Sequence, residues 1–272
     1  MTSDLAPRRL AQRINDHFFL PPREILFIIC SSAGFVKSVV KHYVKQASIA
    51  GTPMCNLYSM TRSRDEVRKW FDVGDNRAAA IEPQNAIFPG YEAPVVRIAD
   101  DGERELVKLN WGFVLLQTGK APRRVTNVRD DKILSSKFWK VSFEERRCLV
   151  PASSYCEPKG EKPAIWHWFA LKGDEHRPLF AFPGIWRQYK GPLKKDGESV
   201  VQDVFAFMTT EPNELTASIN HERMPVLLST KEQCATWLHG TTAEAFALAR
   251  PFDAKSMRIV QHGADRTDLL AA

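Results

Sequence analysis

The dipeptide Met54–Cys55 offers unusual chemistry, because methionine aminopeptidase removes a methionine that precedes a small residue. A chain that starts at Met54 would then begin with Cys55. An N-terminal cysteine carries a thiol with a pKa of about 8.5 and an α-amine with a pKa of about 7.7. The neutral amine can attack an aldehyde to form an imine, and the thiol can then close a five-membered thiazolidine ring. The alternative is that Cys55 is a small buried hydrophobic residue, as most cysteines are.

A second candidate for chemistry is the pair Asn127 and Arg129. In an extended segment, side chains two residues apart face the same side. Asparagine offers a neutral donor and acceptor, and arginine offers a bidentate fork that suits phosphate. Taken alone, the pair is better explained as a capping asparagine and a solvated arginine.

Glu157 lies among aromatic and apolar neighbours, and such surroundings raise the pKa of a carboxyl group. A raised pKa is what general acid–base catalysis near neutral pH requires. Cys148 and Cys156 lie nearby, but their interval and the lack of a second pair do not suit zinc. We therefore expect two buried structural thiols, and neither a metal nor a cofactor.

His221 lies ahead of Arg-Met-Pro and an apolar run, which indicates a rigid loop. A lone histidine is more often a structural residue with satisfied hydrogen bonds than a catalyst. Each of these motifs is therefore weak on its own.

The pattern along the chain predicts an α+β fold with recurrent short strands and irregularly interspersed helices. Trp166 and Trp168 alternate around His167 on a strand, which favours a core face over a platform for stacking bases. A turn is expected at 100–102. The expected strands cover 93–98, 105–114, 164–171, 179–186 and 204–209, and the expected helices cover 63–71, 131–138, 231–238 and 243–249.

The net charge of +6 is unevenly distributed along the 272 residues. Residues 1–53 carry +4, so the remaining chain carries only +2, and any contact with DNA must rest on a local basic patch. Five scattered cysteines argue against a secreted disulfide scaffold and favour a reducing cytoplasm. The longest apolar run, 24–36, is broken by serines and falls short of the ~20 residues of a membrane span.

The order of the motifs is more specific than any one of them and resembles the SRAP family, named for SOS-response-associated peptidases. The resemblance runs from residue 54 to about 261. It is carried by Met54–Cys55, Trp111-Gly-Phe113, Asn127-x-Arg129, Arg146-Arg-Cys-Leu-Val-Pro151 with Glu157, and His221-Glu-Arg-Met-Pro225.

The resemblance implies a compact, β-rich α+β domain of mostly antiparallel strands with flanking helices and a positively charged cleft. Its partner would be single-stranded DNA containing abasic sites, bound by a cytoplasmic, nucleoid-associated monomer. Cys55 would form a covalent thiazolidine crosslink, with possible self-processing peptidase and lyase activity. By the same likeness Asn127 positions the reacting N-terminus, Glu157 is the acid–base group and His221 assists opening of the sugar.

The sequence keeps the family residues implied for the chemistry but lacks some of those implied for contact with DNA. Arg129 would hold phosphate, and Pro89 resembles a family segment near the site. The family's usual Met-Cys-Gly-Arg start is here Met-Cys-Asn-Leu, so one arginine that touches DNA is missing. The Pro-Gly-Trp run expected after Trp111-Gly-Phe113 is replaced, and the Trp after the glutamate is Pro158. The residues expected to supply positive charge instead are Lys120, Arg123 and Arg124.

Two rival functions use some of the same residues. A cysteine peptidase would use Cys55, His221 and Asn127 as a triad, and an N-terminal-nucleophile amidohydrolase would use the α-amine of Cys55 as base. Glu157 favours crosslinking, because a triad leaves it without a role. A DNA-binding module without catalysis would not need a Met-Cys start.

Residues 1–53 are expected to be a poorly ordered N-terminal extension preceding a domain over 54–272. A free α-amine on Cys55 requires either that translation begins at Met54 or that the extension is a propeptide. The first explanation is favoured, because the family pattern begins abruptly at Met54.

Overall fold

The computed structural model describes residues 56–160, 163–173 and 177–269. Cys55 and residues 1–53, on which two expectations depend, lie outside this range. The strands are β1 (Tyr58–Met60), β2 (Gln84–Ile87), β3 (Glu92–Ile98), β4 (Arg104–Trp111), β5 (Phe113–Leu115), β6 (Arg123–Val125), β7 (Asn127–Arg129), β8 (Arg147–Ala152), β9 (Ser154–Lys159), β10 (Ile165–Leu171), β11 (Phe180–Pro192), β12 (Ser199–Thr210), β13 (Met224–Pro225) and β14 (Met257–Gly263). The helices are α4 (Arg64–Trp70), α5 (Asp130–Ile133), α6 (Lys140–Glu145), α7 (Glu214–Ala217), α8 (Lys231–His239) and α9 (Thr242–Ala247), with 3₁₀ turns η1 (Asp75–Arg77) and η2 (Ala254–Ser256).

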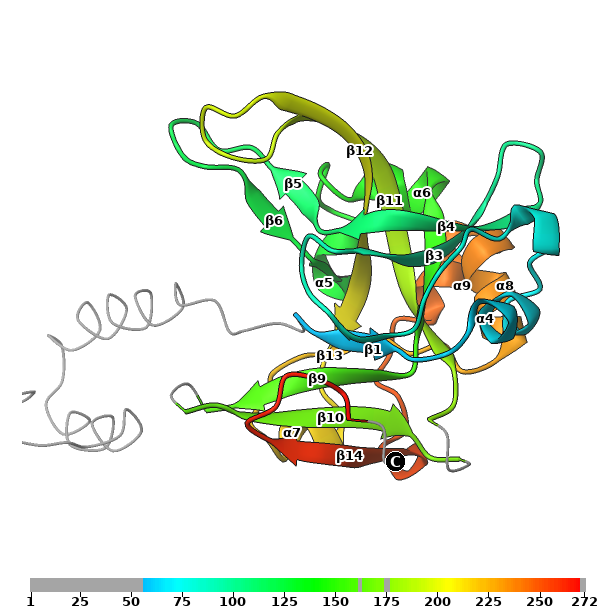
Figure 1. The fold of residues 1–272 in the computed structure, drawn as a ribbon, viewed down its shortest axis with the longest axis vertical. Helices are drawn as coiled ribbons and strands as arrows, with labels where there is room; N and C mark the ends of the chain where they lie inside the picture. Colours follow the sequence, from blue (N-terminus) through cyan, green and yellow to red (C-terminus); the bar gives the residue numbers. More distant parts are fainter. Residues whose placement is uncertain (1–55, 161–162, 174–176, 270–272) are drawn as a thin grey trace, which may run out of the picture. The chain divides into compact units, whose positions relative to one another are not determined.

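The larger sheet closes on itself as a barrel (Figure 1). Its strands follow the order β11–β8–β3–β4–β12, and β12 pairs again with β11 to complete the ring. Most pairs are antiparallel, but β12 runs parallel to β4 and β7. Closure of the sheet leaves few free strand edges. The short strands β7 and β13 pair with the last part of β12.

The second sheet has the order β14–β10–β9–β1–β2 and lies below the barrel in Figure 1. Strand β1 begins this sheet at Tyr58, paired with Tyr155 of β9 on one side and Ile87 of β2 on the other. Strands β8 and β9 follow each other directly, so the chain passes from the barrel to the second sheet at residues 152–154. This passage brings Glu157 of β9 next to the barrel.

An aromatic cluster fills the space between the two sheets. Tyr58 meets the ring of Trp111 edge-on at 5.0 Å, and Phe207 stacks on both Trp111 and Phe182. All four side chains are fully buried. Trp168 is fully buried as well, in a smaller cluster with Leu57 and Cys156, which confirms the core assignment for Trp168, whereas Trp166 is only partly buried against this cluster.

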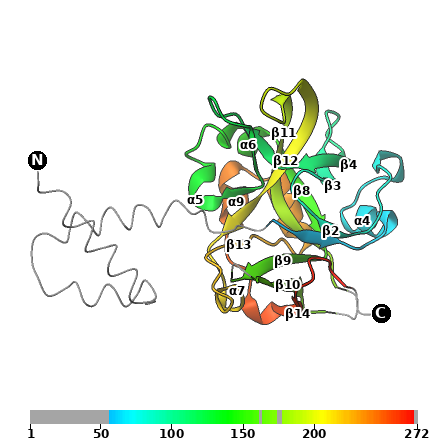
Figure 2. The ribbon, with the colours of Figure 1, turned by 60° about the vertical axis from the view of Figure 1, so that its left-hand side comes forward.

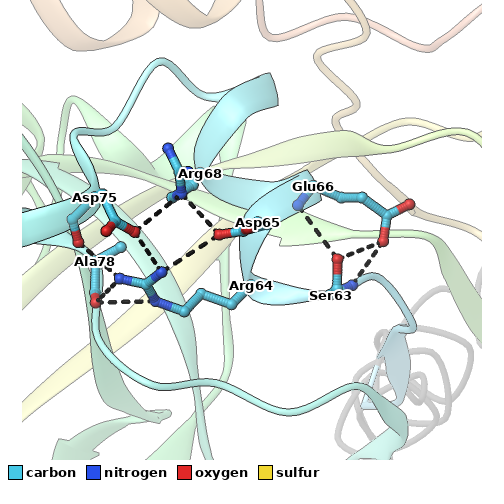
Figure 3. Close-up of polar contacts among 7 residues, drawn as sticks. All are labelled: Ser63, Arg64, Asp65, Glu66, Arg68, Asp75 and Ala78. Atoms are coloured by element: carbon cyan, nitrogen blue, oxygen red, sulfur yellow. Dashed lines mark hydrogen bonds and ion pairs between the residues drawn. The ribbon is translucent and has the colours of Figure 1, made fainter.

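Helix α4 shows how local sequence fixes an element (Figure 3). The Ser63 side chain caps the backbone of Glu66, and the Glu66 carboxylate accepts from the Ser63 backbone N–H. This capping box confirms the helix predicted over 63–71. Arg64 and Arg68 then reach Asp75 at 2.6 and 3.3 Å and so fasten the helix to the following turn.

Several predicted elements need correction. The strand expected over 105–114 is interrupted at Gly112, whose φ of +116° turns the chain from β4 into β5. The helix expected over 131–138 is wrong beyond its first residues, since α5 ends at Ile133 and the next helix, α6, begins only at Lys140. The last two expected strands are parts of the long pair β11 and β12, which extend well beyond the apolar runs that marked them.

The α+β class, rich in mostly antiparallel strands and flanked by helices, is confirmed. Helices α8 and α9 were predicted close to their observed bounds. In the described residues, no helix is both long and apolar enough to cross a membrane.

Candidate active site

The centre of the candidate site is a buried contact between an acid and a histidine. Nε2 of His221 lies 3.3 Å from Oε2 of Glu157, and the two residues are only 5% and 1% exposed. Glu157 comes from β9, and His221 comes from the loop between α7 and β13 (Figure 2). These two predicted site residues are therefore brought together from distant parts of the sequence.

His221 is oriented by its other ring nitrogen. Nδ1 lies 3.3 Å from the carbonyl oxygen of Arg223, and a neutral ring that donates there leaves the Nε2 lone pair toward Glu157. Burial lowers the pKa of His221, against smaller opposing effects of the Arg223 carbonyl and Glu222. A neutral imidazole and a carboxyl group can make this contact only if one proton lies between them. An imidazole and a carboxyl group at this distance are chemically able to share one proton.

The loop that carries His221 is anchored by Arg223. Its guanidinium donates to Asp130 Oδ1 and to the carbonyl oxygen of Thr209, both at 2.6 Å. The Thr210 hydroxyl donates to the other oxygen of Asp130 at 2.7 Å. The conformation of the loop is therefore tied to the residues at the ends of β12 and β7.

Asn127 is buried on β7, opposite Phe207 of β12. Its Nδ2 donates to the Thr126 hydroxyl at 3.1 Å, and that hydroxyl donates to Oδ1 of Asn56 at 3.0 Å. Trp111 also fixes this segment, because its indole N–H donates to the Thr126 carbonyl oxygen at 3.1 Å. Asn127 is thereby linked to Asn56, the residue bonded to Cys55 in the sequence.

The chain also reaches Glu157 through β1. The backbone N–H of Cys156 donates to the carbonyl oxygen of Leu57, and the register of β1 with β9 pairs Tyr58 with Tyr155. Continued by two residues, this antiparallel register places Asn56 opposite Glu157. Asn56 is therefore linked to Asn127 through the Thr126 hydroxyl, and the extended register directs it toward Glu157. Cys55 itself lies outside the described residues.

Arg129 does not share the environment of Asn127. Its side chain is exposed and forms two hydrogen bonds with Asp131, at 2.9 and 2.8 Å. Hydrogen bonding to Asp131 raises the pKa of Arg129 and, in return, lowers the pKa of Asp131. Arg129 is thus a surface cation that an acidic neighbour partly neutralises, at the edge of the site.

Pro89 and Arg124 lie together on another side. Gly90, with φ +88°, donates its N–H to the Trp111 carbonyl at 2.7 Å, and this fixes the turn that contains Pro89. A Cβ atom on Gly90 would lie 3.1 Å from Nε of Arg124, so the turn and the guanidinium pack closely. Arg124 is half-buried, and this desolvation lowers its pKa. Arg123, its neighbour on β6, is exposed.

The cysteines that the structure describes are unsuited to nucleophilic chemistry. Burial is the main cause that raises the pKa of Cys148, Cys156 and Cys234, the last to about 12. All three thiols are buried, as expected for structural residues. Across the described ranges, no group of three or more His, Cys, Asp or Glu side chains could hold a metal ion.

The sequence model of the family described as SOS response associated peptidase (SRAP) matches residues 54–263. The chain belongs to the SRAP family. Two SRAP relatives in Bacillus subtilis are named abasic site processing proteins, YoqW and YoaM, and they are 27% and 29% identical to this chain. Each alignment covers 76% of this chain and at least 90% of the relative.

Two solved structures share this SRAP fold. A protein from Bordetella bronchiseptica superimposes with a TM-score of 0.59 at 19% identity, over 75% of this chain and 97% of its own. A protein from Bacteroides thetaiotaomicron gives 0.57 at 23% identity, over 75% and 90%. At these identities the likeness concerns the fold alone.

Sequence reasoning missed several residues that position the SRAP site. Arg223 was visible inside the His-Glu-Arg-Met-Pro motif, but its partner Asp130 lies far away in sequence and carries no signal of its own. Thr126 and Asn56 likewise gain their roles only from the pairing of strands. Leu57 stands where the family resemblance expects an arginine, and its side chain is buried in a cluster with Trp168 and Cys156.

Proposed function

We propose that this SRAP protein processes abasic sites in single-stranded DNA by forming a covalent thiazolidine crosslink through an N-terminal Cys55. Family membership and the names of the Bacillus relatives support abasic sites as the substrate. The aldehyde of an abasic site is the electrophile that an adjacent amine and thiol capture. The reaction requires a free α-amine, since an amide nitrogen is neither basic nor nucleophilic.

The observation that carries the proposal is the buried contact of His221 with Glu157, which lies on the strand β9 that pairs with β1, close to Asn56 in the sequence. Imine formation needs an acid to protonate the departing oxygen and a base to accept the proton of the attacking amine. A proton shared between a carboxyl group and an imidazole can serve both steps. Asn127, fixed through Thr126 to Asn56, is suited to orient the reacting N-terminus.

The reaction is balanced by the loss of one water molecule. The α-amine adds to the sugar aldehyde to give a carbinolamine, and Glu157 donates a proton to its oxygen so that water leaves and an imine remains. The Cys55 sulfur then adds to the imine carbon, and its proton passes to the nitrogen. His221 assists the earlier opening of the sugar ring by taking or returning the proton that it shares with Glu157.

The rival cysteine peptidase would use His221 as the base of a triad with Asn127. The Nε2 atom of His221 faces Glu157 at 3.3 Å, whereas no contact between His221 and Asn127 is observed among the described residues. This arrangement favours the acid–base pair over the triad.

The experiment that tests the proposal uses two single-stranded oligonucleotides. One contains an aldehydic abasic site, and the other contains the tetrahydrofuran analogue, which has no aldehyde. A chain beginning at Cys55 should give an SDS-stable band with the first only. Equal bands with both oligonucleotides, or none with the aldehyde, would overturn the assignment.

A further inference from the structure

Two hairpin loops lie side by side at the end of the barrel remote from β13 (Figures 1 and 2). One loop joins β5 to β6 and the other joins β11 to β12. Together they line a hollow of about 210 Å³. Three lysines contribute to its wall, Lys120 from the first loop and Lys194 and Lys195 from the second. We call this hollow the lysine cleft.

The lysine cleft carries a local excess of positive charge. All three lysines are exposed, and none forms an ion pair within the ranges that the structure describes. Asp196 is the one acidic residue among those lining the hollow, with Glu198 two residues further along. Some surface cations, such as Arg129 and Lys231, are paired with carboxylates, whereas the three lysines of the cleft are unpaired in the described part of the chain and gathered around one hollow. Lysines left free in this way are suited to a polyanion with several charges.

Strand β12 connects the lysine cleft to the candidate active site. It begins at Ser199, just after the second loop, and reaches Phe207 opposite Asn127. At roughly 3.3 Å per residue, the separation along the strand is about 26 Å. Arg123 and Arg124 lie between these points on β6, which leads from the first loop toward Asn127. Basic groups therefore continue from the cleft toward the site.

We propose that the lysine cleft is a second DNA site, which binds phosphates of the strand several nucleotides from the reacting abasic site. This inference rests on the proposed function, because the continuous run of basic groups selects DNA as the polyanion. Lysine binds phosphate as a point charge that adapts to the backbone without reading sequence. The cleft supplies positive charge near β5, where the Pro-Gly-Trp run expected from the family resemblance is absent.

Because the two sites are far apart, only a sufficiently long oligonucleotide can bind both at once. At about 3.4 Å per nucleotide in a stacked strand, 26 Å corresponds to about eight nucleotides, and to fewer when the strand is extended. An oligonucleotide with about two nucleotides on each side of the central position cannot touch both sites. One with about ten nucleotides on each side can do so.

The test compares a triple variant, Lys120→Gln, Lys194→Gln and Lys195→Gln, with a control of equal net charge, Lys69→Gln, Lys172→Gln and Lys255→Gln. The control lysines are also exposed but lie outside the cleft. Affinity is measured against salt concentration for single-stranded DNA that carries the tetrahydrofuran analogue at its central position. On the long strand, the cleft variant should lose about 2 from the log–log salt slope, since each phosphate contact contributes about 0.7. On the short strand its slope should equal that of the wild type.

Equal slopes for the wild type and the cleft variant on the long strand would overturn the proposal, as would an equal loss in the control variant. Asp196→Asn provides a second measurement in the opposite direction. Asparagine tolerates the positive φ of this residue, and removal of the carboxylate should tighten binding to the long strand only. Because the analogue has no aldehyde, the result is independent of crosslinking. If the wild type forms no crosslink but the cleft variant still shows the reduced salt slope, the proposed chemistry is rejected and the DNA site in the cleft is supported.

Discussion

The Nε2 atom of His221 lies 3.3 Å from Oε2 of Glu157, in a space that solvent barely reaches. The other ring nitrogen, Nδ1, bonds the Arg223 carbonyl oxygen, so the ring cannot turn away from Glu157 without losing that hydrogen bond. In the proposed chemistry, Glu157 and His221 share one proton across this contact and act as a unit. Removal of either member leaves the other buried without its partner.

Glu157→Gln should slow crosslinking by about 10²–10⁴-fold, the usual contribution of a positioned acid–base group. Binding of single-stranded DNA should persist, because Glu157 is buried and presents no charge to phosphate. Single-turnover crosslinking rates between about pH 6 and 8 provide the measurement. Glu211→Gln, on an exposed residue, is the matched control. Rates equal to those of the wild type at every pH would remove Glu157 from the mechanism.

The stability of the protein should depend on His221 at acidic pH. Burial lowers the pKa of His221 in the folded state, whereas an unfolded histidine has a pKa of about 6.5. Below that pH the unfolded chain takes up a proton that the folded chain resists, so the free energy of unfolding falls as pH decreases. The steepest fall due to one such group is about 1.4 kcal/mol per pH unit.

Urea unfolding of the wild type and His221→Gln across this pH range tests the prediction. The variant should lose less stability on acidification than the wild type does. His167 and His239, whose pKa values burial also lowers, would account for what remains. A variant with the same acid-side loss as the wild type would show that His221 is protonated as readily in the folded chain as in the unfolded chain.

Arg129→Ala should weaken binding to single-stranded DNA and reduce the log–log salt slope by about 0.7, as the loss of one phosphate contact does. Asp131→Asn is the informative partner variant, because it releases Arg129 from its two hydrogen bonds and removes a negative charge. It should tighten binding. A salt slope unaffected by Arg129→Ala would show that Arg129 forms only a surface ion pair with Asp131 and does not contact phosphate.

The buried ion pair of Arg177 with Asp268 is expected to stabilise the fold without a role in chemistry. Asp268 is completely buried and also accepts from the hydroxyls of Ser59 and Ser154, so it joins the C-terminal segment to β1 and β9. Asp268→Ala leaves the arginine without its partner and should cost about 3–5 kcal/mol in the free energy of unfolding. Chemical denaturation measures this cost. A loss below about 1 kcal/mol, typical of exposed pairs, would contradict the prediction.

The sequence was most informative where short-range chemistry decides the structure. The helices predicted over 63–71 and 231–238 agree with α4 and α8, and both helices begin with a capping box. The long pair β11–β12 was recognised only in its apolar half, because the outer half is mostly polar and owes its strand structure largely to backbone pairing. Closure of the barrel could not be foreseen, since it depends on which distant strands become neighbours.

The same limit applies to the candidate site. Glu157 and His221 were singled out separately, but their contact follows from the placement of β9 beside the loop after α7. The expectation that Asn127 and Arg129 share a face missed their different environments. Asn127 is buried on β7 next to β12, whereas Arg129 occupies the first position before α5 and its side chain bonds Asp131. Motif order identified the family, and tertiary pairing assigned each residue its partners.

The most direct test of the proposed chemistry is the intact mass of the protein after reaction with an aldehydic abasic oligonucleotide. Three forms are compared: a chain beginning at Cys55, the same chain with Cys55→Ser, and the full 272-residue chain shown by mass to retain its N-terminus. The first should give an adduct equal to protein plus DNA minus one water, stable to borohydride as a closed thiazolidine is. The other two should remain unmodified. A stable adduct of the same mass on Cys55→Ser, or on a chain that retains residues 1–54, would contradict the thiazolidine mechanism.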